Sequence, residues 1–184
     1  MGRIRALSCC VVVVFLWTVA LPGGTAARPG DAGISAGPVS WGQIASWKLG
    51  RDGLGAVRIG MTVGAVQRAT GRAMIRGYGF PSCQTWTLAG APGGLGITTA
   101  YGRVARIDIR NRRWRTARGI RIGDRGWRVK RAYGVRAVGH EYTRGQYLIT
   151  RGKRRLLFET SSTGKVTRFR AGRPPYVEFV EGCL

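Results

Sequence analysis

The chain has 184 residues and a formal charge of +23, with 31 lysine and arginine residues against 8 acidic ones. Its apolar fraction of 44% is enough to build a core, which excludes wholesale disorder, and its length suits one domain or two small repeats rather than a multidomain enzyme. The single histidine, His140, excludes any metal site that needs two imidazole ligands.

The N-terminal segment has the pattern of a secretory signal peptide over residues 1–27. Arg3 and Arg5 precede an almost wholly apolar run over 6–21, and small residues follow up to Ala27. We expect cleavage after Ala27, so that a bacterial host secretes the protein or keeps it in its envelope. An uncleaved membrane anchor is the alternative, but the apolar run is shorter than the roughly 20 residues that a spanning helix needs.

Cleavage would leave a chain of charge +21 with two cysteines, Cys83 and Cys183. An even pair in an oxidising compartment predicts one disulfide. It would close a loop of about 100 residues, for which chain-entropy arguments give a stabilisation of roughly 4–5 kcal/mol. A redox pair or a cysteine nucleophile is the alternative, although the sequence has no CxxC motif and only one histidine to act as a base.

The rest of the chain divides into a linker and two related halves. Residues 28–40 are rich in Pro, Gly, Ser and Ala and are typical of a flexible linker. Residues 57–71 align with residues 120–134 at an offset of 63, with seven of fifteen positions identical. A second pair of blocks, 102–107 and 164–169, aligns at an offset of 62. We therefore predict two tandem repeats, over 41–117 and 118–184.

Each aligned block predicts a short helix. Thr62 and Asp124 are the available N-caps, and Gly71 and Gly134 can take the positive φ that ends a helix. The spacing i, i+3, i+4 predicts one buried face per helix. The residues expected on these faces are Val66, Ala69 and Thr70 in the first helix and Val129, Ala132 and Tyr133 in the second. Trp127 is also expected in the core, because it lies on the second helix.

Strand-like segments follow each helix, separated by short turns. In 103–109, Ala105, Ile107 and Ile109 alternate with polar residues, which is typical of a half-buried strand. A last strand over 176–180 would return Cys183 to the body. The predicted fold class is α+β, with two tandem repeats of a short helix followed by antiparallel β-hairpins forming one sheet. The other predicted strands are 84–88, 95–99, 146–150, 154–160 and 165–171.

The Ile-Gly-Met-Thr segment over 59–62, the short helix ending in glycine and the hairpins, all duplicated, resemble the β-lactamase inhibitory protein fold. A single copy of a similar unit occurs in the small lipoprotein of the outer-membrane β-barrel assembly machinery. Segments 53–62 and 177–183 also resemble uncharacterised secreted proteins of actinobacteria. The resemblance covers roughly residues 54–183. It implies a non-catalytic extracellular protein-binding scaffold that uses a sheet face.

Basic density is the strongest functional signal in the residues themselves. Residues 103–136 hold 13 Arg and Lys against two Asp. Strand alternation places four arginines on one sheet face, an arrangement that can accept anions. Trp114 lies between arginines, where exposure and burial are equally open. The predicted anion or partner surface is Arg106, Arg110, Arg168, Arg170 and Trp114.

Two interpretations of this charge remain open beside a protein-binding role. The chain could be a cationic module that binds anionic wall polymers, phospholipid or extracellular nucleic acid. Alternatively, the arginines could reflect the codon bias of a GC-rich genome. A hydrolase using His140 beside Glu141 is a remote third hypothesis. No metal-ligand spacing, dinucleotide fingerprint or phosphate-binding loop motif occurs in the sequence, so we expect no cofactor and no catalytic residue.

Overall fold

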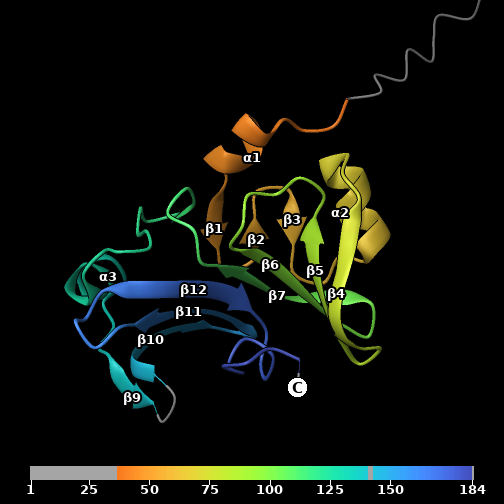
Figure 1. The fold of residues 1–184 in the computed structure, drawn as a ribbon. Coiled ribbons are helices and arrows are strands. Elements are labelled where there is room, and N and C mark those ends of the chain that lie inside the picture. The colour runs from red at the N-terminus through yellow and green to blue at the C-terminus, as the bar shows by residue number, and fades with distance from the viewer. Residues whose placement is uncertain (1–36, 141–142, 184) are drawn as a thin grey trace, which may run out of the picture. The chain divides into compact units, whose positions relative to one another are not determined.

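The computed structural model describes residues 37–140 and 143–183, which fold as a mixed α+β unit (Figure 1). The predicted signal peptide, residues 28–36 of the predicted linker, Glu141 and Tyr142 lie outside these described residues. Within residues 37–140 and 143–183, no helix is long and apolar enough to cross a membrane. The α+β class expected from the sequence is confirmed.

The larger sheet has eight antiparallel strands in the order β4-β5-β6-β7-β12-β11-β10-β9. Four strands precede residue 110 and four follow residue 137, and the pairing of β7 with β12 joins the two groups. Six of these strands match the predicted ones to within three residues, while β4 and β9 were not predicted. The strands are Met74–Phe80 (β4), Cys83–Leu88 (β5), Leu95–Ala100 (β6), Arg103–Ile109 (β7), Val138–His140 (β9), Thr143–Arg151 (β10), Arg154–Thr160 (β11) and Val166–Gly172 (β12).

One eight-residue helix precedes each group of four strands. Helix α2 (Val63–Thr70) has Thr62 as its N-cap, whose Oγ1 accepts a hydrogen bond from the backbone N–H of Ala65 (3.2 Å). Helix α3 (Gly126–Tyr133) begins one residue later than predicted. Its N-cap is Arg125, which makes no side-chain cap, so the expectation for Asp124 is wrong. Both helices end at a left-handed glycine, as predicted, at Gly71 and Gly134.

Asp124 has another role, because its carboxylate accepts hydrogen bonds from outside the helix backbone. Oδ2 accepts from the backbone N–H of Arg121 (2.8 Å), and Oδ1 accepts from Nη1 of Arg128 (2.7 Å). The carboxylate therefore closes the turn before α3 and is not available to its first N–H groups.

The segments before α2 and before α3 make the same backbone contacts with their own halves. Each segment exchanges two hydrogen bonds with the strand that ends its group and adds one isolated bridge. Aligned residues make these contacts in the two halves. They are Gly60 N to Val104 O, Val104 N to Met61 O and the Thr62–Arg103 bridge in the first half, and Gly123 N to Val166 O, Val166 N to Asp124 O and the Arg125–Lys165 bridge in the second.

A second, smaller sheet was not predicted, so the expectation of a single sheet is wrong. It has the order β3-β2-β1-β8, and β8 lies parallel to β1. Its strands are too short for the alternation rule to detect. They are Lys48–Gly50 (β1), Gly53–Leu54 (β2), Val57–Arg58 (β3) and Arg115–Thr116 (β8). Helix α1 (Trp41–Ser46), capped by Ser40 and Gln43, precedes them.

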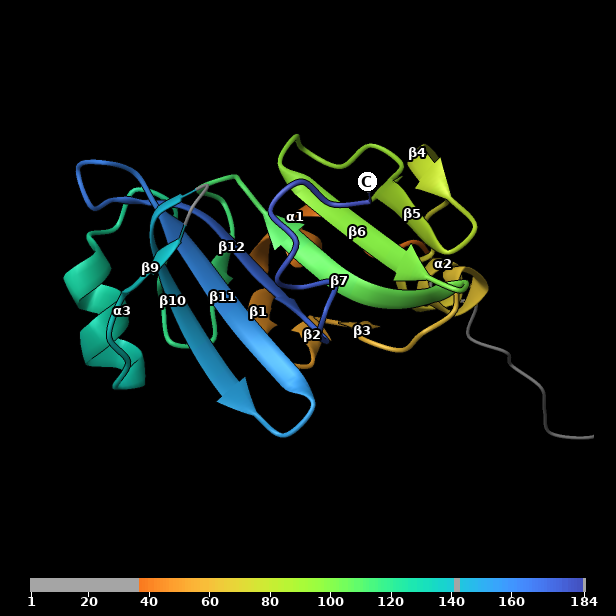
Figure 2. The same cartoon turned by 90° about the horizontal axis from the view of Figure 1, so that it is seen from below.

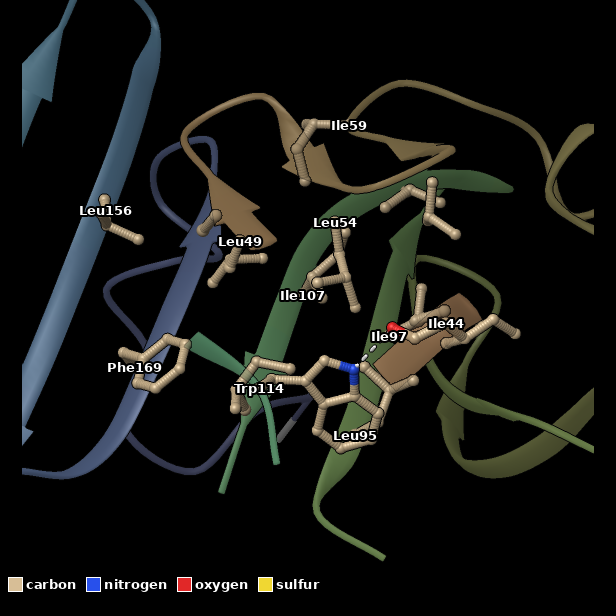
Figure 3. Close-up of a cluster of buried hydrophobic side chains, with 14 of the residues drawn as sticks. Ile44, Leu49, Leu54, Ile59, Leu95, Ile97, Ile107, Trp114, Leu156 and Phe169 are labelled. Atoms are coloured by element: carbon tan, nitrogen blue, oxygen red, sulfur yellow. Dashed lines mark hydrogen bonds between the residues drawn. The ribbon is translucent and has the colours of Figure 1, made fainter. Parts of the chain in front are cut away.

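The hydrophobic core lies between the larger sheet and the layer of small sheet and helices. Figure 3 shows Trp114 within this core, close to Leu95 and Ile107. Trp114 is fully buried, and its indole N–H donates to the backbone carbonyl of Ile44 (3.2 Å). An aromatic ring with a satisfied N–H is well suited to burial. The expectation that Trp114 contributes to a binding surface is therefore wrong.

The C-terminal strap (residues 173–183) crosses the face of the larger sheet opposite to the core (Figure 2). Its residues 176–180 form turns and not the predicted strand, since Val177 N bonds back to Arg173 O and Glu178 N to Pro175 O. Val177 of the strap is fully buried. The strap ends in the predicted Cys83–Cys183 disulfide, with an S–S distance of 2.08 Å, which is confirmed.

Candidate functional site

The four arginines of the predicted stripe lie on the strap side of the larger sheet. Ala105, Ile107 and Ile109 of β7 are buried in the core, so Arg106, Asp108 and Arg110 project to the opposite face. Arg168 and Arg170 of β12 project to the same face, beside Glu159 of β11. The shared face was thus predicted correctly, but its exposure was not. The strap leaves Arg106 only 3% exposed and Arg170 fully buried.

Two of these arginines hold the strap. Nη1 of Arg106 donates to the carbonyls of Tyr176 (3.0 Å) and Phe179 (2.7 Å). Nη1 of Arg168 donates to the carbonyl of Val180 (2.9 Å). Part of the hydrogen-bonding capacity of these two arginines is therefore used on backbone carbonyls of the same chain.

Two carboxylates neutralise part of the buried charge. Asp108 Oδ2 lies 2.6 Å from Nε of Arg106. Glu159 lies between two arginines, 2.7 Å from Nη2 of Arg170 and 3.6 Å from Nε of Arg168. We call these five residues the strap cluster: Arg106, Asp108, Glu159, Arg168 and Arg170. With three guanidinium groups and two carboxylates, the strap cluster has one excess positive charge.

Among these arginines, Arg170 is the one whose pKa is lowered most clearly by burial. The pKa of Arg170 is lowered to about 10, mainly by burial and then by repulsion from Arg106, while Glu159 and Asp108 oppose the shift. Burial also lowers the pKa of Arg168, again opposed by Glu159. With a pKa of about 10, Arg170 remains charged at neutral pH, and the three arginines form an internal ionic network with Asp108 and Glu159 under the strap. They do not form the open anion-accepting surface that the sequence predicted.

Arg110 is the member of the predicted stripe that stays exposed. It lines a cavity of about 330 Å³ beside the strap, together with Arg106, Asp108 and Glu181. Two carboxylates and two guanidinium groups make this cavity mixed in charge. It therefore has no electrostatic preference for an anion.

A different pocket concentrates positive charge. It has a volume of about 390 Å³ and lies where residues 112–122 meet the start of α3. We call it the arginine pocket, and its charged lining residues are Arg112, Arg115, Arg121, Arg128 and Asp124. Its single carboxylate is already engaged by the backbone of Arg121 and by the Arg128 guanidinium.

Three arginines of the arginine pocket form no ion pair in the described structure, although Asp124 lines the same pocket. No ion pair joins Arg112, Arg115 or Arg121 to a carboxylate within residues 37–140 and 143–183. All three residues are exposed. The count of cations over 103–136 identified this region, but sequence alone did not show which of them converge.

The solvent face of α3 carries an aromatic residue that the sequence assigned to the core. Trp127 is 55% exposed, so that expectation is wrong. The buried face of α3 runs through Val129, and Trp127 lies two residues away, about 200° around the helix. Trp127 lines a groove of about 290 Å³ with Lys130, Arg131 and Arg136, which we call the Trp127 groove.

His140 belongs to β9, where its backbone pairs with Thr143. In the described part of the chain, no group of three or more His, Cys, Asp or Glu side chains is arranged to hold a metal ion. The arginine pocket and the Trp127 groove are the candidate site.

Comparison with known proteins does not assign this chain to a family. No protein-family model and no curated protein matches the chain. Two solved structures are similar to it at low scores. One is a cysteine-rich secretory protein from Staphylococcus aureus Mu50, with a TM-score of 0.48, 9% identity, and 68% of this chain aligned to 48% of that one. The other is an extracellular protein containing an SCP domain from Bacillus anthracis Ames, with a TM-score of 0.41, 11% identity, and 63% of this chain aligned to 44% of that one. The chain thus spans about half the length of each.

Proposed function

We propose that this chain is an exported, non-catalytic protein that binds phosphate-bearing anionic polymers through the arginine pocket. The observation that carries the proposal is the charge balance of that pocket, with four arginines around one carboxylate that is already hydrogen-bonded. Guanidinium groups donate parallel N–H bonds to phosphate oxygens and stay charged at any physiological pH. A polymer suits the site because further cations continue along α3.

Export is supported by two independent features. The N-terminal sequence has the basic, apolar and small-residue regions of a secretory signal. The Cys83–Cys183 disulfide belongs to the kind of bond that persists in oxidising compartments. Both features favour a location outside the cytoplasm, where wall polymers, lipid headgroups and released nucleic acid are the available polyanions.

The proposal includes an origin for the fold by duplication of one unit. The aligned sequence blocks, the equivalent backbone contacts before α2 and α3 and the two groups of four strands support it. A tandem arrangement of this kind is what the resemblance to the β-lactamase inhibitory protein fold implies. We therefore propose that the chain has a tandem fold of that type.

A protein partner is a second candidate function, supported by the exposed apolar side chains of β4. This strand forms one edge of the larger sheet, and its Ile75, Tyr78 and Phe80 are each more than half exposed. Exposed apolar residues on an edge strand favour protein contact. The basic sheet face predicted from sequence is less suitable, because the strap covers most of it.

The polymer proposal is tested with the exported form, starting at Arg28, against linear polyphosphate at several salt concentrations. We expect binding that weakens steeply with salt, because condensed counterions are released. The double variant Arg115→Gln/Arg121→Gln should bind at least about 10-fold more weakly at low salt.

The matched control is Arg58→Gln/Arg68→Gln, which removes the same charge from exposed positions in the first half. It should retain most of the affinity. Equal losses in the two double variants would mean that the affinity comes from the net charge alone, and an absence of binding at low salt would refute the proposal. Retention of a protein ligand at high salt, lost in Phe80→Ser, would favour the second candidate.

A further inference from the structure

Helices α2 and α3 differ on their solvent faces, although two of their core-facing positions carry identical residues. Both have eight residues, follow the same backbone contacts and end at a left-handed glycine. Alignment at an offset of 63 keeps the residues that pack inward, with Val66 matching Val129 and Ala69 matching Ala132. Three outward residues change from small or neutral to aromatic or cationic, while Arg68 matches Arg131. The changes are Gly64 to Trp127, Ala65 to Arg128 and Gln67 to Lys130.

This difference argues against codon bias as the source of the basic surface. A composition bias acts on both halves of one chain alike, so it would not confine new cations and a tryptophan to one helix. The exposed Trp127 ring also lies beside these cations, so the surface offers an aromatic face together with positive charge. The solvent face of α3 thus has the composition of a binding surface.

The Trp127 groove has a consistent chemistry. Lys130 and Arg131 stand three and four residues after Trp127, so their side chains flank the ring on one helix face. Arg136 and Val135 complete the lining after the helix ends. The polar side chains that line the groove are hydrogen-bond donors only, and residues 125–136 contain no acidic residue.

We propose that the Trp127 groove binds a base of single-stranded nucleic acid, with the base stacked on Trp127 and the flanking phosphates at Lys130, Arg131 and Arg136. This inference rests on the proposed function and names the polymer. Aromatic rings combined with a positive groove are how proteins bind single strands without sequence preference. A duplex is excluded from this mode because its bases are already stacked on one another.

A sugar-phosphate wall polymer fits the groove less well. Sugar hydroxyl groups both donate and accept hydrogen bonds, so their recognition uses acceptor side chains as well as donors. The groove supplies no carboxylate or amide side chain. A nucleobase presents a flat π face and acceptor atoms on its edge, which a tryptophan and cationic donors can satisfy.

The arginine pocket and the Trp127 groove both include residues of α3. Arg128 lines the arginine pocket, and its neighbour Trp127 lines the groove. A single strand can therefore place phosphates in the arginine pocket while one of its bases reaches Trp127. The two sites would act on one ligand, with the pocket supplying most of the electrostatic affinity and the groove supplying the preference for bases.

The test compares binding of the exported form to a thymidine oligonucleotide, an abasic oligonucleotide of equal length, a duplex and a poly(glycerol phosphate). We expect the thymidine oligonucleotide to bind tightest. Trp127→Ala should weaken it about 10-fold and leave the abasic strand unchanged, because only stacking is lost. Trp127→Phe should restore most of the affinity. The oligonucleotide should quench the tryptophan fluorescence of the protein, and the extent of quenching should be smaller in Trp127→Phe.

The outcomes separate this inference from the proposed function. If no polyanion binds, the proposed function fails. If the abasic strand and the thymidine oligonucleotide bind equally, or Trp127→Ala weakens both to the same extent, base stacking is refuted while the arginine pocket stands. If poly(glycerol phosphate) binds tightest and Trp127→Ala weakens it, the groove serves a wall polymer and the nucleic-acid proposal is overturned.

Discussion

Asp108 lies directly opposite Arg170 where β7 pairs with β12 and joins the two groups of four strands. The offset of 62 that aligns 102–107 with 164–169 also aligns these two residues. Equivalent strands therefore meet at equivalent positions. Because one half supplies an acid and the other a base there, opposite charges face each other at the centre of the sheet, where two identical charges would repel.

The excess charge of the strap cluster leads to a prediction about Arg170. Replacing it by methionine removes one guanidinium and leaves two complete pairs, Arg106 with Asp108 and Arg168 with Glu159. Buried ionic groups often contribute nothing net, and apolar replacements of similar volume can be stabilising. We expect Arg170→Met to leave the free energy of unfolding unchanged or to raise it by about 1–2 kcal/mol, measured by urea denaturation.

Glu159→Gln is the matched comparison. It leaves two buried guanidinium groups and the half-buried Arg168 facing only Asp108, so we expect a loss of about 3–5 kcal/mol. If Glu159→Gln is harmless while Arg170→Met is strongly destabilising, the cluster does not carry excess positive charge and this account of it is wrong.

The disulfide should contribute strongly to stability, because it closes a loop of 100 residues. The double variant Cys83→Ala/Cys183→Ala should lower the free energy of unfolding by about 4–5 kcal/mol in the chain-entropy treatment. Arg106 and Arg168 still hold the strap through backbone carbonyls, so the loss should appear in global unfolding. Hydrogen exchange at the strap amides is the accompanying measurement. Rapid exchange there in the variant, with the rest of the sheet protected, would show that the arginines alone do not hold the strap.

The C-terminal ends of α2 and α3 and six strands could be predicted from the sequence, because these features depend on local signals. Glycines able to take positive φ marked the ends of α2 and α3, and alternation marked strands such as β7. The two-residue strands β2 and β3 are too short to show a period. In β4, Gly77 and Gly79 interrupt the pattern, and its outer residues are exposed because the strand lies at the sheet edge.

The binding surface was harder to predict, because burial of a charged strand face depends on what covers it. Alternation placed Arg106 and Arg170 on the correct face, but no local signal shows that residues 173–183 cross that face. The two tryptophans were misjudged for a similar reason. Trp114 lies among arginines yet fills the core through contact with Ile44, seventy residues earlier, which no local window includes.

Substitution of the two tryptophans tests directly that Trp114 is buried and Trp127 is exposed. Trp114→Ala removes a fully buried ring and its hydrogen bond to Ile44, so we expect a loss of about 3–5 kcal/mol. Trp127→Ala changes a residue that is 55% exposed, and the expected loss is below about 1 kcal/mol. Thermal and urea denaturation of both variants provide the measurement. Similar losses at the two positions would contradict the burial described here.

The two helix-terminal glycines should respond differently to substitution, although both adopt positive φ. At Gly134 an added Cβ meets no heavy atom within 4 Å, so Gly134→Ala costs only the left-handed conformation, about 1 kcal/mol. At Gly71 the same Cβ would collide with the backbone of Pro38. Val39 holds this segment in place, since its N–H donates to Thr70 O and its carbonyl accepts from Arg72.

We therefore expect Gly71→Ala to cost clearly more than Gly134→Ala in urea denaturation. Asparagine distinguishes the cost of the left-handed backbone from that of the collision with Pro38, because it tolerates the left-handed region but still carries a Cβ. Gly134→Asn should recover most of the stability, and Gly71→Asn should not. If asparagine rescues both positions equally, the close approach of Pro38 does not constrain Gly71, and residues 37–39 contribute little to the stability of the fold.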